Sequence, residues 1–200
     1  MAVVVLATAC ERPLSDQGSG RSRASLSDSA LRATPGYVVD SILLPEEALR
    51  RFRVGLDSVA RLDGAPSAEK LVQRFFTALE RRDAGALQAL AITKAEFAWV
   101  VYPGSRLSHP PYYQPPEIAW MLLQNSSNTG FGRLLQRGAG GSAHPAGHTC
   151  AAPERDGNVT VQRNCRVRVS LASEFSKRKL FGAIVEHSGH YKFLGFDTDF

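Results

Sequence analysis

The sequence has no long hydrophobic run and none of the short motifs that mark common catalytic sites. No stretch approaches the roughly 20 apolar residues that a membrane-spanning helix needs, so a membrane bundle is not expected. A glycine-rich phosphate loop, a Gly-x-Ser-x-Gly elbow and a Cys-x-x-Cys pair are also lacking. We therefore assign no catalytic residue, and we expect no cofactor and no metal.

Charge of one sign is not concentrated along the chain. The formal net charge is +5 over 200 residues, and the arginines are scattered among acidic residues. A nucleic-acid-binding protein usually carries a basic stripe or patch, so we do not expect nucleic acid as a partner. The 44% of hydrophobic and 22% of charged residues are ordinary for a globular chain. This length suits one domain with an extension.

Cysteine is scarce, and the first of the three cysteines follows a short apolar run. Residues 1–9 read Met-Ala-Val-Val-Val-Leu-Ala-Thr-Ala before Cys10. The run resembles the end of a bacterial lipoprotein signal peptide, which implies that Cys10 is lipidated and anchors the protein to the cell envelope, on the periplasmic or extracellular side. Leu6 lies one position early and no basic residue precedes the run, which a start codon placed too far downstream would explain. A buried N-terminal strand with an ordinary Cys10 is the alternative.

The segments that follow predict a tether and an extension before the main domain. Residues 11–36 are rich in Ser, Gly, Arg and Asp and cannot bury enough surface to offset ordering, so they predict a flexible tether. Residues 37–66 predict a strand over 37–44 and a helix that begins at Pro45 and continues to about Val59.

Apolar periodicity predicts helices between residues 67 and 137. Ser67 is a suitable N-cap for the clearest helix, whose apolar stripe contains Leu71, Val72, Phe75, Phe76 and Leu79. A short helix is expected around residues 86–91. Another, heavily buried, begins at Pro116 and is interrupted at residues 125–130. Residues 97–102 are helix or strand.

Alternating side chains predict strands in the last third of the chain. Residues 159–171 alternate apolar and polar side chains with one lapse at Arg163, which predicts one strand. A hairpin turn centred on Gly157-Asn158 places Cys150 directly opposite Cys165. Directly opposed residues lie within reach of a disulfide, which an oxidising compartment permits.

A second hairpin is predicted from residues 179–187 and 190–197, which a Ser188-Gly189 turn joins. Its register pairs Val185 with Lys192 and Gly182 with Gly195. Phe181 and Phe196 fall on the same face as Val185, together with Ala183 and Leu194. Because both faces are apolar, we expect the hairpin in the middle of a covered sheet.

The order of these elements resembles the nuclear-transport-factor-2-like, or SnoaL-like, α+β cone. The resemblance covers residues 67–200 and depends on the helix at 68–80, the following residues 82–87 and the closing segment 191–196. It implies an α+β fold in which N-terminal helices pack on a curved antiparallel sheet around a central pocket.

Two features are candidate ligand sites. Trp99, Tyr102, Tyr113 and Trp120 combine apolar area with a polar group and could line a pocket, although a core and its lid would use the same residue types. The facing pair Gly182 and Gly195 either forms a pocket floor or allows a helix to pack closely.

Acid, base and metal candidates have no diagnostic spacing. The titratable candidates are Glu96, His109, His187, His190 and Asp197. The spacing of His144, His148 and Cys150 resembles a metal-ligand set, but it would use a cysteine that the disulfide needs.

We therefore expect a non-enzymatic, lipid-anchored binding domain whose partner is a small apolar ligand or an envelope protein. The alternative is a small enzyme of SnoaL type, an isomerase, cyclase or hydratase that acts on an apolar small molecule. A third possibility is a module that forms a homodimer through its sheet.

Overall fold

The computed structural model describes residue 35 and residues 43–137, 144–171 and 174–199. The chain divides into two units, Met1–Ile42 and Leu43–Phe200, and the elements below belong to the second unit. Cys10, the expected tether apart from Pro35, and residues 37–42 of the expected strand lie outside the described residues. Within the described ranges, no helix has both the length and the apolar character needed to cross a membrane.

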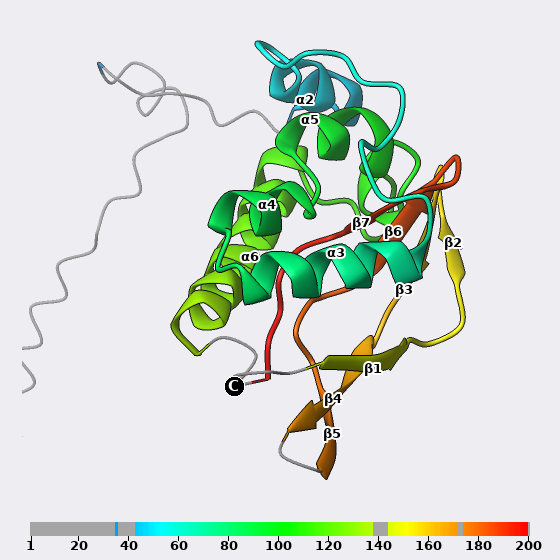
Figure 1. The fold of residues 1–200 in the computed structure, drawn as a ribbon. Coiled ribbons are helices and arrows are strands. Elements are labelled where there is room, and N and C mark those ends of the chain that lie inside the picture. Colours follow the sequence, from blue (N-terminus) through cyan, green and yellow to red (C-terminus); the bar gives the residue numbers. More distant parts are fainter. Residues whose placement is uncertain (1–34, 36–42, 138–143, 172–173, 200) are drawn as a thin grey trace, which may run out of the picture. The chain divides into compact units, whose positions relative to one another are not determined.

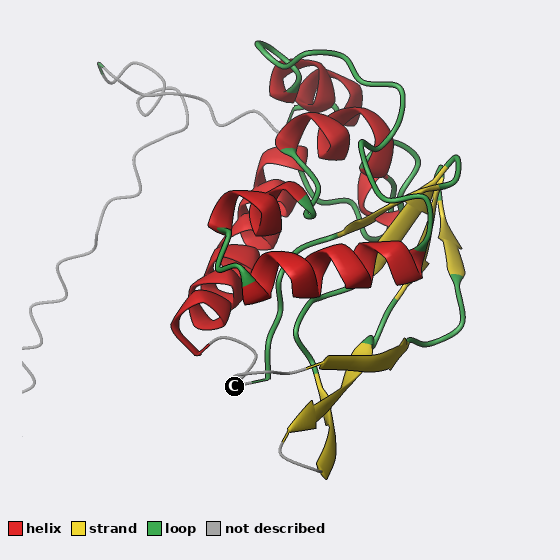
Figure 2. Cartoon of the chain, in the orientation of Figure 1, coloured by secondary structure: helices red, strands yellow, loops and turns green. Residues whose placement is uncertain are grey.

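The fold is mixed α+β, as expected, with the helices preceding the strands along the chain (Figures 1 and 2). The helices are α2 (Pro45–Phe52), α3 (Ala68–Glu80), α4 (Ala84–Ala89), α5 (Lys94–Glu96) and α6 (Pro116–Arg137). A π-helical turn, η1 (Phe97–Val101), continues α5 and shows that this segment is helical. A 3₁₀ turn, η2 (Arg106–Ser108), follows it.

Side-chain caps explain where three of these helices begin. Ser67 Oγ accepts a hydrogen bond of 3.2 Å from the Lys70 amide, which confirms the predicted N-cap of α3. Asp83 caps α4, and Thr93 forms a capping box with Glu96 at α5. The prediction of a helix to Val59 was wrong, because α2 ends at Phe52 and a turn with Gly55 at φ 77° follows.

Helix α6 is continuous, so the expected interruption at residues 125–130 was wrong. The polar side chains at residues 125–130 do not break the helix. One of them bonds to the helix backbone: Thr129 Oγ1 donates to the Asn125 carbonyl at 2.9 Å. The helix is also less buried than expected. Ile118, Met121 and Leu122 are exposed, while Ala119 and Leu134 are buried.

The strands form two antiparallel sheets. One has the order β1-β4-β5 and contains β1 (His144–Thr149), β4 (Arg166–Leu171) and β5 (Glu174–Arg178). The other has the order β2-β3-β6-β7 and contains β2 (Glu154–Asp156), β3 (Val159–Gln162), β6 (Ile184–His187) and β7 (His190–Phe193). Helix α3 contacts β1 of the first sheet and β7 of the second.

The disulfide prediction is confirmed. Asp156 pairs with Val159 around the predicted turn, Thr149 pairs with Arg166, and Cys150 is bonded to Cys165 with their Cα atoms 4.0 Å apart. The single strand expected over residues 159–171 was wrong. It is broken into β3 and β4 beside the lapse at Arg163, where Asn164 adopts φ 53°. The bridge therefore lies at the bend where one sheet passes into the other.

The last hairpin has the predicted register, but its environment differs. Val185 pairs with Lys192, and the Gly182 amide donates to the Gly195 carbonyl at 2.9 Å. Both strands are shorter than expected, and β7 is an edge strand, so the central position was wrong. Backbone groups of Ala65, Leu90 and Ile92, in the helical half of the domain (residues 43–137), bond to that edge, so Phe193 is fully buried although β7 ends the sheet.

Two clusters of buried side chains form the core. In the first, the Phe75 ring on α3 is fully buried and contacts the rings of Phe76, Phe181, Phe193 and Phe196. The second joins Phe52, Phe97 and Tyr102 to valines of β3 and β6. Phe181 and Phe196 lie in the first cluster and Val185 lies in the second, so the prediction that they share one face of the hairpin was wrong. The change of face occurs beside Gly182 and Gly195.

We predict that replacing both Cys150 and Cys165 with Ala lowers the free energy of unfolding of the oxidised protein by about 3 kcal/mol. The bridge closes a loop between residues 15 apart, and crosslinking a loop of that size restricts the unfolded chain by about this amount. Urea unfolding with and without a reducing agent measures it, and reduction should bring the wild type close to the variant. Two free thiols in non-reducing mass spectrometry of the wild type would contradict the prediction.

Candidate functional site

A groove of about 270 Å³ runs along one side of α6 where that helix meets the bend between the sheets. Helix α6 contributes one wall, the bend at Arg163 and Asn164 contributes another, and the segment after β7 forms part of the floor. The lining residues are Leu123, Ser126, Ser127, Arg163, Asn164, Lys179, Gly182, Ala183, Leu194, Gly195, Phe196 and Asp197.

Close backbone approach positions α6 at this groove. A Cβ atom added at Gly130 would lie 2.4 Å from the Phe196 carbonyl oxygen, and one at Gly195 would lie 3.1 Å from Ser127 Cβ. The Phe196 amide donates to Ser127 Oγ at 3.1 Å, and this hydrogen bond holds the segment after β7 against α6. Both interpretations of the glycine pair therefore apply: Gly195 allows the helix to approach, and together with Gly182 it lines the groove.

The charges of the groove lie around an apolar floor. Leu123, Ala183, Leu194 and Phe196 supply apolar surface. Lys179 Nζ forms an ion pair with Asp197 Oδ2, and Arg163 has longer contacts of 3.5 Å to Asp156 and 3.9 Å to Glu154. The candidate acid Asp197 is thus engaged by a lysine and is half exposed. Such a site suits a small molecule with an apolar body and a polar or negatively charged end.

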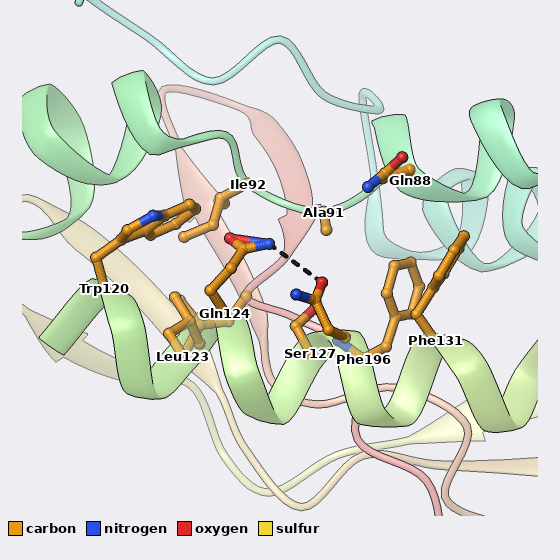
Figure 3. Close-up of a pocket in the computed structure, with 11 residues that line it drawn as sticks. Gln88, Ala91, Ile92, Trp120, Leu123, Gln124, Ser127, Phe131 and Phe196 are labelled. Carbon is orange, nitrogen blue, oxygen red and sulfur yellow. Dashed lines mark hydrogen bonds between the residues drawn. The ribbon is translucent and has the colours of Figure 1, made fainter. Parts of the chain in front are cut away.

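A smaller cavity of about 40 Å³ lies beside the same helix and is shown in Figure 3. Gln88, Ala91 and Ile92 face α6 across it, and Gln124 donates a hydrogen bond of 3.4 Å to Asn128. Its volume is that of a few water molecules, too small for a metabolite. Leu123, Ser127, Leu194 and Phe196 line both hollows, so the contact between α6 and the segment after β7 separates them.

The structure does not gather the four aromatic candidates around this cavity. Trp120 lines the small cavity. Tyr102 is buried in the second core cluster, where its hydroxyl donates to the Gln114 carbonyl at 2.8 Å, and burial raises the pKa of Tyr102 to about 12. The Arg53 guanidinium lies 3.9 Å from the centre of the Trp99 ring. Trp99 Nε1 and the Tyr113 hydroxyl are buried without a hydrogen-bond partner among the described residues.

Glu96, another acid candidate, is held in a buried ion pair. Lys192 Nζ lies 2.9 and 3.1 Å from its two oxygens, and each side chain is only 4% exposed. The amides of Asp63 and Thr93 donate to the same carboxylate at 2.7 Å each. Burial alone would raise the pKa of Glu96, but these hydrogen bonds outweigh it and lower the pKa overall. The carboxylate is therefore charged and joins the helical half to β7.

The histidine candidates lie elsewhere. His187 and His190 face each other at the end of the last hairpin, and His109 is exposed in a loop. The described part of the chain contains no group of three or more His, Cys, Asp or Glu side chains that could hold a metal ion. Cys150 is bonded to Cys165, so it has no thiolate with which to bind a metal ion together with His144 and His148.

The residues that the sequence did not single out are Ser126, Ser127, Arg163, Asn164 and Lys179. Two signals pointed to four of them, and none to Lys179: the lapse at Arg163 in an otherwise alternating strand, and the polar run at residues 125–130 in an otherwise apolar helix. No protein-family model, curated protein or solved structure matches the chain.

We predict opposite effects for two glycine substitutions in α6. Gly130→Ala should destabilise the fold, because the new Cβ would meet the Phe196 carbonyl at 2.4 Å. Gly132→Ala is the matched control, since it meets no atom within 4 Å and should stabilise the helix by at most about 1 kcal/mol. Thermal unfolding of both variants measures the difference. Equal melting temperatures would show that α6 does not approach residue 196 closely.

Proposed function

We propose that the protein is a non-enzymatic binding domain whose groove beside α6 holds a small molecule with an apolar body and a negatively charged end. The residues that line the groove support this proposal. Its floor is apolar, and two of its three charged side chains, Arg163 and Lys179, are cations. Binding sites for small molecules commonly combine apolar walls with a few such orienting groups. An envelope protein that inserts a side chain into the groove is the competing partner.

A nuclear-transport-factor-2-like cone is the architecture we propose for residues 67–200. The strand orders of the two sheets support it. Strands β1, β4 and β5 of one sheet are adjacent along the chain to β2, β3 and β6 of the other, in the same order, as expected of long strands that bend. The Ala151 amide donates to the Arg163 carbonyl at 2.8 Å, so the ladder continues across the bend. Helix α3 packs against this surface through the phenyl rings around Phe75.

Binding is favoured over catalysis for two reasons. The phenyl rings of Phe75, Phe181 and Phe193 fill the space between α3 and the sheet, where an enzyme of SnoaL type would hold its substrate. A general acid or base must lie within hydrogen-bond reach of the proton that it transfers. The groove's carboxylate at Asp197 is paired with Lys179, and Glu96 is committed to Lys192.

We further propose that Cys10 is lipidated and holds this domain at the bacterial envelope. The apolar run before Cys10 and the Ser- and Gly-rich segment at residues 11–36 support an anchor and a tether. The Cys150–Cys165 bridge also supports export, since disulfides persist in oxidising compartments.

A groove-filling variant tests the binding function. Ser126→Trp should block the groove, whereas Asn125→Trp places the same bulk on an exposed position of α6 that does not line it. We expect carboxylated apolar fragments to shift the NMR amide signals of Gly182 and Gly195 in the wild type and in Asn125→Trp, and not in Ser126→Trp. The fragments should be recovered chemically unchanged. Fragments that are turned over, or that bind Ser126→Trp equally well, would contradict the proposal.

The anchor is tested by labelling cells with a palmitate analogue. Wild-type protein and the Cys150→Ala/Cys165→Ala variant should both carry the label and fractionate with membranes, because neither change touches the lipidation site. Cys10→Ala should lose the label and leave the membrane fraction. If Cys10→Ala still labels and sediments like the wild type, Cys10 is not the anchor.

A further inference from the structure

Helix α6 carries apolar side chains on two opposite faces. Its inner face packs into the core through Ala119 and Leu134. The face turned away from the core has four large apolar side chains, between 42% and 52% exposed: Ile118, Met121, Leu122 and Leu135. A surface helix normally turns polar and charged residues outward, and a helix that is apolar all round is normally covered all round. The outer face of α6 therefore has the character of a surface that another element covers.

The described part of the chain has no second surface of this kind. Four of its seven exposed large apolar side chains lie on α6, and the others lie at the two ends of α2 and in the loop before α6: Leu44, Val54 and Tyr112. The exposed residues described on the strands are polar or charged, apart from Gly147. Single exposed apolar residues need no explanation, whereas a group of them marks an interaction site. A contact between molecules is thus expected at α6 and not at the sheet.

The outer residues of α6 follow a heptad pattern. Spacings of three and four residues alternate along this face, and the positions that they join are Ile118, Met121, Asn125, Asn128, Gly132 and Leu135. Residues spaced in this way form one stripe along a helix, and the stripes of two helices pack with each side chain in a hole between four others. We name these six positions the outer seam of α6. The partner that fits such a seam is a second helix.

The outer seam is complementary to itself when two copies of α6 run antiparallel. The midpoint of the helix, which spans Pro116–Arg137, lies between residues 126 and 127. A two-fold axis through that point places residues at equal distances from it opposite one another. The resulting pairs are Ile118 with Leu135, Met121 with Gly132, and Asn125 with Asn128.

These pairs suit the space and the hydrogen-bonding groups available. Nothing lies within 4 Å of a Cβ atom built at Gly132, so the flexible Met121 side chain of the second copy has room there. Asn125 and Asn128 each carry an amide donor and an amide acceptor, so they can bond to each other between copies. A polar asparagine within an apolar seam commonly sets the register of two helices.

The charges of α6 favour the same arrangement. Residues 118–132 contain no charged side chain, and this stretch is bounded by Glu117 in the first turn and by Arg133 near the other end. Both side chains are exposed, and neither forms an ion pair with another described residue. An antiparallel pair brings Glu117 of one copy toward the end that carries Arg133 in the other, whereas a parallel pair would bring like charges together.

We propose that two copies of the chain associate through the outer seams of their α6 helices, which pack antiparallel about a two-fold axis. The helix has 22 residues and is about 33 Å long, so the contact extends over about six turns. Figure 1 shows α6 on the side of the domain away from β2, so the sheets are not part of this contact. The inference depends neither on the groove nor on the anchor at Cys10.

Sedimentation equilibrium of the full chain tests the association, in a Cys10→Ala background so that neither a lipid nor a free thiol links two copies. We expect dimers, which Met121→Lys/Leu122→Lys should weaken about a hundredfold or more because it buries uncompensated ammonium groups in the contact. Leu44→Lys/Val54→Lys replaces side chains that are 75% and 72% exposed elsewhere, and it should dimerise like the parent chain.

Three results of that experiment would overturn the proposal. A parent chain that is monomeric at millimolar concentration would leave the outer seam to a different partner. An α6 variant that still dimerises would move the contact to another surface, such as the sheet. An equal loss in both double variants would show that the seam is not specific.

Crosslinking tests the direction of the helices. Met121→Cys and Gly132→Cys are made separately in the same background, whose two remaining cysteines are bonded to each other. When the two are mixed and mildly oxidised, a disulfide between residues 121 and 132 of different copies should form in preference to bonds between identical residues. Arg74→Cys, on the exposed side of α3, is the control and should not crosslink. Mainly identical-residue bonds, or equal crosslinking of the control, would contradict the antiparallel pair.

A melting experiment separates a lost contact from a damaged fold. At a dilution at which the parent chain is monomeric, Met121→Lys/Leu122→Lys should melt close to it, because both side chains are about half exposed in the single chain. At a concentration at which the parent chain is dimeric, its melting temperature should rise above that of the variant. A variant that melts well below the parent chain at both concentrations would show that this face packs within the chain, and would refute the dimer.

Discussion

The outer edge of β7 is the constraint on which the rest of the domain depends. The Ala65 amide and carbonyl exchange hydrogen bonds of 2.9 and 2.8 Å with Tyr191, and Phe193 bonds in the same way to Leu90 and Ile92 at 2.9 Å each. Between them, Lys192 reaches the buried carboxylate of Glu96. Two connecting segments of the helical half therefore complete the sheet at an edge that would otherwise be open to other strands.

The pairing of β7 with residues 65 and 90–92 determines where the groove can form. Once β7 is fixed against the helical half, the chain beyond it must pass under α6, and Gly130 and Gly195 permit that contact. The groove and the small cavity are the spaces left on either side of it.

Local chemistry predicted much of the fold. The turn at Gly157-Asn158 has one favoured geometry, and it fixed the pairing of Cys150 with Cys165. The Ser67 cap and the Ser188-Gly189 turn were predictable for the same reason. The edge position of β7 was not, because its covering bonds come from Ala65 and Leu90, more than 100 residues away in the chain. The exposed face of α6 and the groove likewise depend on tertiary contacts that no short window of sequence contains.

The bonds that cover β7 also govern the order in which the chain can assemble. Because Ala65, Leu90 and Ile92 find their partners only in residues 191–193, the helices alone cannot seal their own core. In a chain still emerging from a ribosome, the Phe75 ring would lack the phenyl rings of residues 181, 193 and 196, and the Glu96 carboxylate would lack Lys192. Assembly of the helical part of the chain is thus delayed until residues 191–193 are available to pair with it.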